Sequence, residues 1–137
     1  MRTRRTLALG VIVTVVVASR LLAHHAWPVD RTNQITITGT VTAYTWAEPH
    51  VMIALDVQAN GTIEKWKVGA SNRKYSAAGG WDKNSFKPGD VVTAIGYRFI
   101  DGSNMLQVQK IVTASGQELH YGSPPQRTPP SVRSTPN

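Results

Sequence analysis

The sequence predicts a mainly β domain, a small barrel of five to six strands with one short helix between the third and fourth strands. Three observations support this prediction. Short segments with alternating apolar residues recur between residues 34 and 121. Turn dipeptides of the Asn-Gly and Asp-Gly type separate several of these segments. One stretch, residues 71–80, breaks the alternation and has the residue pattern of a short helix.

The first predicted strand is "QITITGTVTAYTW", residues 34–46. Threonines dominate one face, and the other face carries the mostly apolar series Ile35, Ile37, Gly39, Val41 and Ala43. This alternation is typical of a half-buried strand. A glycine in mid-strand indicates a bulge or a sharp bend at Gly39, as a small closed barrel requires.

Two further strands are predicted at residues 51–57 and 62–70, with the strong hairpin signal Asn60-Gly61 between them. The main apolar residues of the third strand are Ile63, Trp66 and Val68. In the helical stretch that follows, Ser71 is a candidate N-cap and Gly79-Gly80 ends the helix. We expect Trp66 to belong to the core and Trp81 to dock the helix end onto the barrel.

The second half of the domain adds two or three strands. A "KPGD" turn at residues 87–90 precedes a fourth strand at 91–100, and Asp101-Gly102 leads to a fifth at 105–114. A last short strand is expected at 117–121. This order of elements is that of an OB-like Greek-key barrel, with another small barrel or sandwich as the alternative.

The first 23 residues have the features of an export signal. Three arginines precede an apolar run at residues 7–18. That run of ~12 residues is shorter than the ~20 that a membrane-spanning helix needs, and Arg20 interrupts its extension. Cleavage after Ala18, cleavage after Ala23 and an uncleaved membrane tether are the alternatives. We therefore expect a periplasmic or secreted protein that contacts the membrane only through an uncleaved N-terminal segment.

Residues 24–121 form the predicted barrel domain, and residues 122–137 form a Pro/Ser/Thr-rich tail whose composition predicts disorder. The net charge is +7, but four arginines lie in residues 1–23 and two in the tail. Between them, nine basic residues face eight acidic ones. Net charge thus gives no support for a basic face, and we expect no nucleic-acid partner. Cysteine is absent, which excludes disulfides and thiolate chemistry.

The stretch "WAEPH", residues 46–50, joins the first two predicted strands, a position that often lines the ligand face of an OB barrel. Trp46 offers an aromatic surface, Glu48 a carboxylate and His50 an imidazole, so all three are candidate ligand- or partner-binding residues. The alternative is that Trp46 fills the barrel end and the rest of the stretch only shapes the turn. Trp27, ahead of the first strand, is either exposed or folded back.

His24, His25 and His50 are candidate metal ligands. Cleavage after Ala23 would make His24 the N-terminal residue, and its α-amine and ring could then chelate one metal. With His25 or His50 added, this becomes an all-nitrogen site suited to copper(II), the one cofactor that the residues suggest. The alternative is that adjacent histidines at a signal junction are polar spacers.

The sequence carries no catalytic motif. It has no Gly-rich phosphate loop, no nucleophile elbow and no cysteine. A Glu48–His50 acid/base pair would need a sharply turned loop, because residues two apart rarely point at one target. We therefore expect no enzymatic activity.

Several stretches carry a family resemblance over residues 23–121. They are "AHHAW" (23–27), "ITITGTVT" (35–42), "WAEPH" (46–50), "GGW" (79–81), "KPGDVVTAIGY" (87–97) and "DGSN" (101–104). With these, the chain resembles an uncharacterised family of exported bacterial proteins with AHH and W-x-x-P-H motifs. Members usually show Asn where this chain has Glu48 and Ser where it has Ala26. The resemblance implies an exported small β-barrel, similar in layout to the bacterial OB-fold stress proteins, and brings no established activity.

These observations predict an exported, non-catalytic binding or accessory module of the bacterial cell envelope. Its expected partner is an unidentified small ligand or an envelope protein. The alternative function is that of a periplasmic copper-binding protein that uses its N-terminal histidines. A third class is a structural protein whose barrel only stabilises an assembly.

Overall fold

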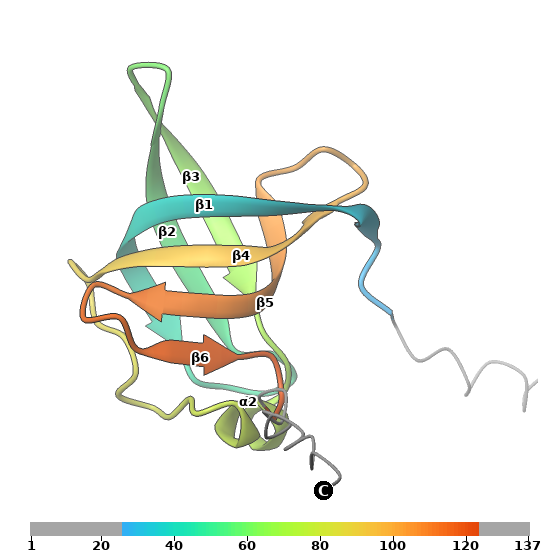
Figure 1. The fold of residues 1–137 in the computed structure, drawn as a ribbon, viewed down its shortest axis with the longest axis vertical. Helices are drawn as coiled ribbons and strands as arrows, with labels where there is room; N and C mark the ends of the chain where they lie inside the picture. The colour runs from blue at the N-terminus through green and yellow to red at the C-terminus, as the bar shows by residue number, and fades with distance from the viewer. Residues whose placement is uncertain (1–25, 124–137) are drawn as a thin grey trace, which may run out of the picture.

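The computed structural model describes residues 26–123 of the 137-residue chain. This part contains six strands and one short helix (Figure 1). In chain order they are β1 (Val29–Thr45), β2 (Met52–Ala59), β3 (Thr62–Gly69), α2 (Arg73–Ala78), β4 (Val91–Phe99), β5 (Met105–Thr113) and β6 (Glu118–His120). The predicted mainly β fold, with a helix between the third and fourth strands, is confirmed.

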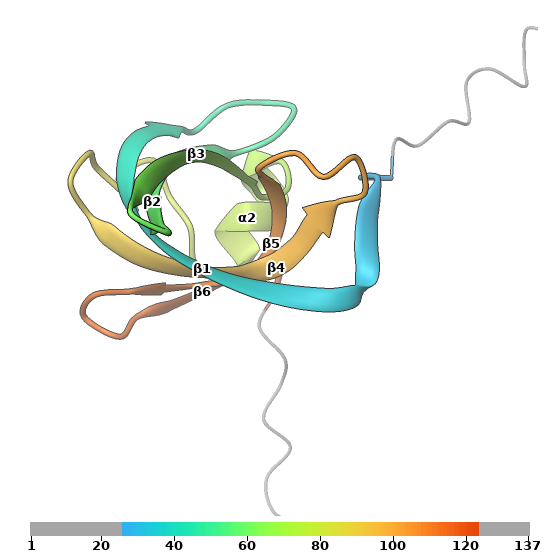
Figure 2. The ribbon, with the colours of Figure 1, turned by 90° about the horizontal axis from the view of Figure 1, so that it is seen from above.

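The strands form one sheet in the order β3-β2-β1-β4-β5-β6, which closes into a barrel where β3 also pairs with β5. This closing pair is parallel and short, Lys67–Gly69 against Met105–Gln107. The other strand pairs of the described chain are antiparallel. In Figure 2, β1 to β5 form a ring, α2 lies across its far end and β6 lies outside it. This is the predicted OB-type barrel.

β1 bends so that it serves both halves of the barrel. Its first part pairs with β4 as far as Thr40, and its last part pairs with β2 from Thr40 onward. At the bend, a Cβ on Gly39 would stand 2.7 Å from the carbonyl oxygen of Asp56. The glycine is therefore required by a close approach of two strands. The bulge itself lies further on, where the register with β2 shifts between Val41 and Ala43.

The bulge makes one burial prediction wrong. Val41 is buried as expected, but Ala43 is exposed because the extra residue reverses the alternation of faces. Tyr44 and Trp46 then pack against the core. Ile63, an apolar residue of the third strand, is 59% exposed on the β2–β3 hairpin, which extends beyond the ring (Figure 1). The predicted turn of this hairpin is confirmed, with positive φ at Asn60 and Gly61.

The core fills the barrel with aliphatic side chains from all five ring strands, together with three aromatic residues, Trp66, Trp81 and Phe86. Trp66 and Trp81 are buried as predicted, at 5% and 2% exposure. The indole N–H of Trp81 donates to the carbonyl of His120 at 2.9 Å and so ties the end of the helix to β6. Asn72, and not Ser71, caps the helix, because its side chain accepts from the N–H of Tyr75.

Residues 1–25 and 124–137, which hold the predicted export signal and most of the predicted tail, lie outside the described part of the chain. Within residues 26–123, no helix has the length and apolarity that a membrane crossing requires.

Candidate functional site

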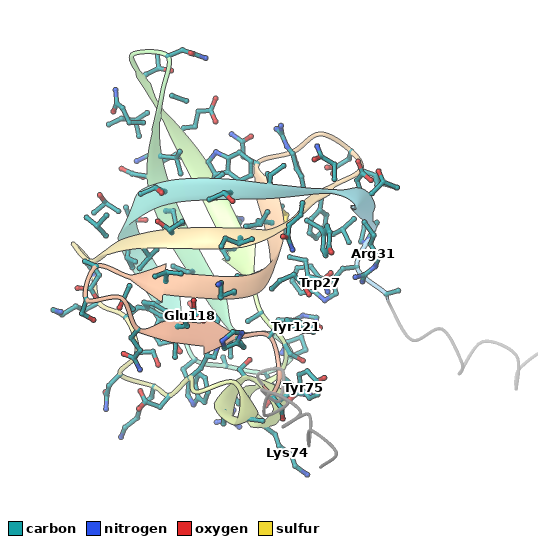
Figure 3. All side chains as sticks on the ribbon, viewed as in Figure 1. Trp27, Arg31, Lys74, Tyr75, Glu118 and Tyr121 are labelled. Carbon is teal, nitrogen blue, oxygen red and sulfur yellow. The ribbon has the colours of Figure 1, made fainter. Side chains whose placement is uncertain are left out.

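The segment ahead of β1 is fastened to the far end of β4. Val29 pairs with Phe99, and the N–H of Ile100 donates to the carbonyl of Pro28 at 2.9 Å. These contacts fix residues 26–28, here called the lead-in, against the barrel. Figure 3 shows Trp27 of the lead-in on the same side of the barrel as Arg31.

Trp27 folds back onto the end of β3, which is one of the two arrangements left open by the sequence. A Cβ on Gly69 would stand 2.1 Å from Cη2 and 2.5 Å from Cζ3 of the Trp27 indole. Non-bonded carbon atoms do not approach so closely, so a side chain at this position would collide with the ring. Gly69 is therefore a seat for the indole, and Trp27 is half-buried on it.

Two more rings pack against Trp27. The His50 ring centroid is 4.6 Å from that of Trp27 with an interplanar angle of 73°, and the Phe99 centroid is 5.4 Å away at 78°. Both contacts are edge-to-face, an arrangement that the ring quadrupoles favour. The cluster joins the lead-in, the β1–β2 loop and the end of β4.

These segments line an open pocket of about 400 Å³, formed by Ala26, Trp27, Pro28, His50 and Phe99 and called the aromatic pocket below. Its volume and its mainly apolar lining suit a small-molecule site. Two other hollows of the described chain have fewer aromatic lining residues. One of about 390 Å³ beside α2 has Tyr75 as its aromatic lining residue, and one of about 260 Å³ near Lys87 has no aromatic lining residue.

The three candidates of the "WAEPH" loop take different partners. Trp46 packs against the core beside Tyr44, with ring centroids 6.5 Å apart. Arg73 donates from its backbone N–H and its Nε to Oε1 of Glu48, at 3.3 and 3.2 Å. The carboxylate of Glu48 is thus engaged with the start of α2. Of the three, His50 lines the aromatic pocket.

The predicted metal ligands His24 and His25 lie outside the described residues. Within residues 26–123, no three His, Asp or Glu side chains gather in a way that could hold a metal ion. His50 is the member of the predicted set that the structure locates, in the same pocket as Ala26. His120 lies on β6, with its Nε2 3.4 Å from a carboxylate oxygen of Glu118.

The turn between β4 and β5, which follows Phe99, is held by Arg98. Its guanidinium donates to the carbonyls of Ser103 and Gly102 at 2.9 and 2.6 Å, and to Oδ1 of Asn104 at 2.8 Å. The same group lies 5.1 Å from the ring centroid of Trp66, a cation–π contact. Phe99, which forms one wall of the pocket, is therefore followed directly by a turn that several hydrogen bonds hold in place.

Three residues of this region were not singled out by the sequence, namely Met52, Gly69 and Phe99. A glycine at the end of a strand pattern does signal a close backbone approach, but it does not name the approaching group. The position of Met52 follows from strand alternation. His50 and Met52 flank the buried Val51, so their side chains lie on the same, outer face. Phe99 carries no such signal, because it is an ordinary residue of a predicted strand.

The fold and the pocket define a class of protein, a closed OB-type barrel with an aromatic pocket built by its lead-in and its first loop. A family model matches residues 11–107, and the chain belongs to that family, DUF6152, a family of unknown function. The predicted membership of an uncharacterised family is thereby confirmed. All five residues that line the aromatic pocket fall within the match. No curated protein matches the chain.

Proposed function

We propose that this protein is an exported, non-catalytic binding module of the cell envelope that holds a small, flat, largely apolar ligand in the aromatic pocket. The observation that carries the proposal is the seating of Trp27 on Gly69. Because the strand leaves room for the indole, one wall of the pocket is formed before any ligand arrives. A preformed wall lowers the ordering cost of binding.

The lining supports a ligand with an aromatic or similarly flat apolar body. Trp27 and Phe99 offer ring surface, and Ala26 and Pro28 offer aliphatic surface. The imidazole of His50 is a hydrogen-bonding group that could orient a single hydroxyl or carbonyl of the ligand.

The same lining supports binding without chemistry. It contains one imidazole and no carboxylate or hydroxyl side chain. Glu48, two residues from His50, is bonded to Arg73 instead. General acid–base or nucleophilic catalysis would need a second positioned group beside the imidazole.

Export is supported by the arginines and the apolar run of residues 1–23, which have the order of a secretory signal. A chain without cysteine depends on no disulfide, so its fold is compatible with an oxidising compartment. The test is fractionation of bacterial cells that express the full chain, beside a variant that lacks residues 2–20. We expect the full chain in the periplasm or medium and the variant in the cytoplasm. The full chain in the cytoplasm would overturn the export proposal.

The binding proposal is tested by an NMR screen of small aromatic fragments, such as indoles and phenols, against the full chain with labelled tryptophan indole N–H groups. We expect fragments to shift the Trp27 resonance and to leave those of Trp66 and Trp81 unchanged, since both are buried. The fragments should no longer bind the Trp27→Ala variant. Fragments that bind this variant as well as the parent, or that shift no tryptophan, would contradict the proposed site.

A second candidate function is copper(II) binding by His24, His25 and His50. The observation in its favour is that His50 and Ala26 line one pocket, and Ala26 is bonded directly to His25. The test is copper(II) titration of the exported form that begins at His24, beside the same form with His24→Ala. Equal and weak copper affinity of the two proteins would contradict this function.

A further inference from the structure

Beside the aromatic pocket, the outer surface carries a second side chain that can bind a metal, the thioether of Met52, next to His50. The β2 strand begins with Met52, and Val51 between the two residues is fully buried. The N–H of Val51 donates to the carbonyl of Ser71, and its carbonyl accepts from the N–H of Ala70. The backbone here is thus fixed on both sides. Since successive side chains of extended chain alternate, His50 and Met52 both lie on the outer face.

Trp27 packs against His50, and it shares the space over Gly69 with the side chain of Met52. Its ring lies 4.6 Å from that of His50, centroid to centroid. The sulfur of Met52 lies 3.2 Å from the point where a Cβ of Gly69 would stand, and Cη2 of Trp27 lies 2.1 Å from that same point. The thioether and the indole therefore lie side by side over Gly69, and the imidazole packs against the indole.

We propose that His50 and Met52, covered by Trp27, bind a soft monovalent cation, copper(I) or silver(I). This inference rests on the proposed binding function and adds a cation site at the His50 side of the aromatic pocket. Thioether sulfur selects soft metals, and copper(I) is the biological member of that class. Imidazole nitrogen is a second suitable donor, and monovalent copper and silver accept low coordination numbers.

The indole contributes in two ways. Its π face attracts a cation held close to the ring, an interaction that is strongest for tryptophan among the aromatic side chains. It also shields one side of the ion from water. Zinc and copper(II) prefer sites with more nitrogen or oxygen ligands, and within residues 26–123 no such group of His, Asp and Glu is present.

The experiment is titration of the full chain with silver(I) nitrate in chloride-free buffer, in a background that carries His24→Ala and His25→Ala. Silver(I) replaces copper(I) because it does not oxidise in air. The readouts are tryptophan fluorescence and the ¹³C–¹H signals of labelled methionine methyl groups. We expect one equivalent of silver to bind, with a shift of the Met52 methyl signal and a change in fluorescence.

The variants are Met52→Leu and, as a matched control, Met105→Leu on β5, where the methionine is also half-buried. Met52→Leu should weaken silver binding by more than about tenfold, the scale on which even outer-shell changes act on metal affinity. Met105→Leu should leave it unchanged. His50→Phe, which keeps a ring against Trp27, should weaken binding as Met52→Leu does.

Equal silver affinity of the parent and Met52→Leu would overturn the inference and leave a methionine–tryptophan packing contact only. Silver binding that is seen solely when His24 and His25 are restored would likewise overturn it. The fragment screen on Met52→Leu separates the two proposals, because Met52 does not line the aromatic pocket and its loss should leave fragment binding at Trp27 in place. Absence of fragment binding in the parent would overturn the proposed pocket, whatever the silver titration shows.

Discussion

Gly69→Ala is the most direct perturbation of the aromatic pocket, because the added Cβ would occupy the space of the Trp27 ring. A tryptophan side chain buries about 150–250 Å². Most of it is covered here, so displacement exposes at least about 100 Å², which at 25 cal/mol per Å² costs at least about 2.5 kcal/mol. Alanine regains about 0.5–1 kcal/mol, because glycine is less favourable within a strand. We expect a net loss of at least about 1.5–2 kcal/mol.

The assay is urea unfolding followed by circular dichroism for the parent, Gly69→Ala, Trp27→Ala and the double variant. In the Trp27→Ala background the ring is gone and the flexible end of Met52 is the remaining close neighbour of the added Cβ, so Gly69→Ala should stabilise the fold by up to about 0.5–1 kcal/mol. The change of sign is the signature of a contact between the two positions. Equal destabilisation in both backgrounds would refute the reasoning, because the glycine would then be required by something other than Trp27.

Three further predictions concern the surroundings of the site. Burial raises the pKa of Tyr44 to about 12 from its usual 10, so stability that is fully present below pH 10 should be lost as the pH rises through 12. Urea midpoints between pH 9 and 12 should show this loss, and Tyr44→Phe should remove it. Arg98→Leu should lower stability by about 1.5–3 kcal/mol, the scale of charged hydrogen bonds, and should speed amide exchange in the turn at residues 100–104. Glu48→Gln should change the unfolding free energy by less than about 1 kcal/mol, because its ion pair with Arg73 is half exposed; a larger loss would mean that the pair organises the loop.

The order of elements could be predicted because each rests on a local signal. Alternation marks the strands, Asn60-Gly61 marks the hairpin, and Gly79 ends the helix. Ala43 was misassigned because a bulge depends on the partner strand, which one strand's pattern does not show. The exposure of Ile63 could not be predicted, because alternation does not say how far a hairpin extends beyond the barrel.

The site was harder to predict than the fold. His50 was singled out by the composition of its loop, yet its partner Trp27 precedes β1, and the seat of Trp27 is at the end of β3. Contacts between such distant segments follow from tertiary packing and leave no local pattern. The glycine of the seat carries no side chain, so its role becomes visible only when the approaching ring is known.

The path of β1 explains why the lead-in and the β1–β2 loop meet. The strand pairs with β4 and then with β2, and it bends at Gly39, where a side chain would strike the β2 backbone. Its start therefore lies beside the end of β4, which brings Phe99 to the lead-in. The short β3–β5 pairing brings the end of β3 into the same closed ring, and with it Gly69 as a seat. The bend and the closure that make the barrel thus also assemble the pocket, so a variant that opens the β3–β5 pair should lose the Trp27 seat together with the ring.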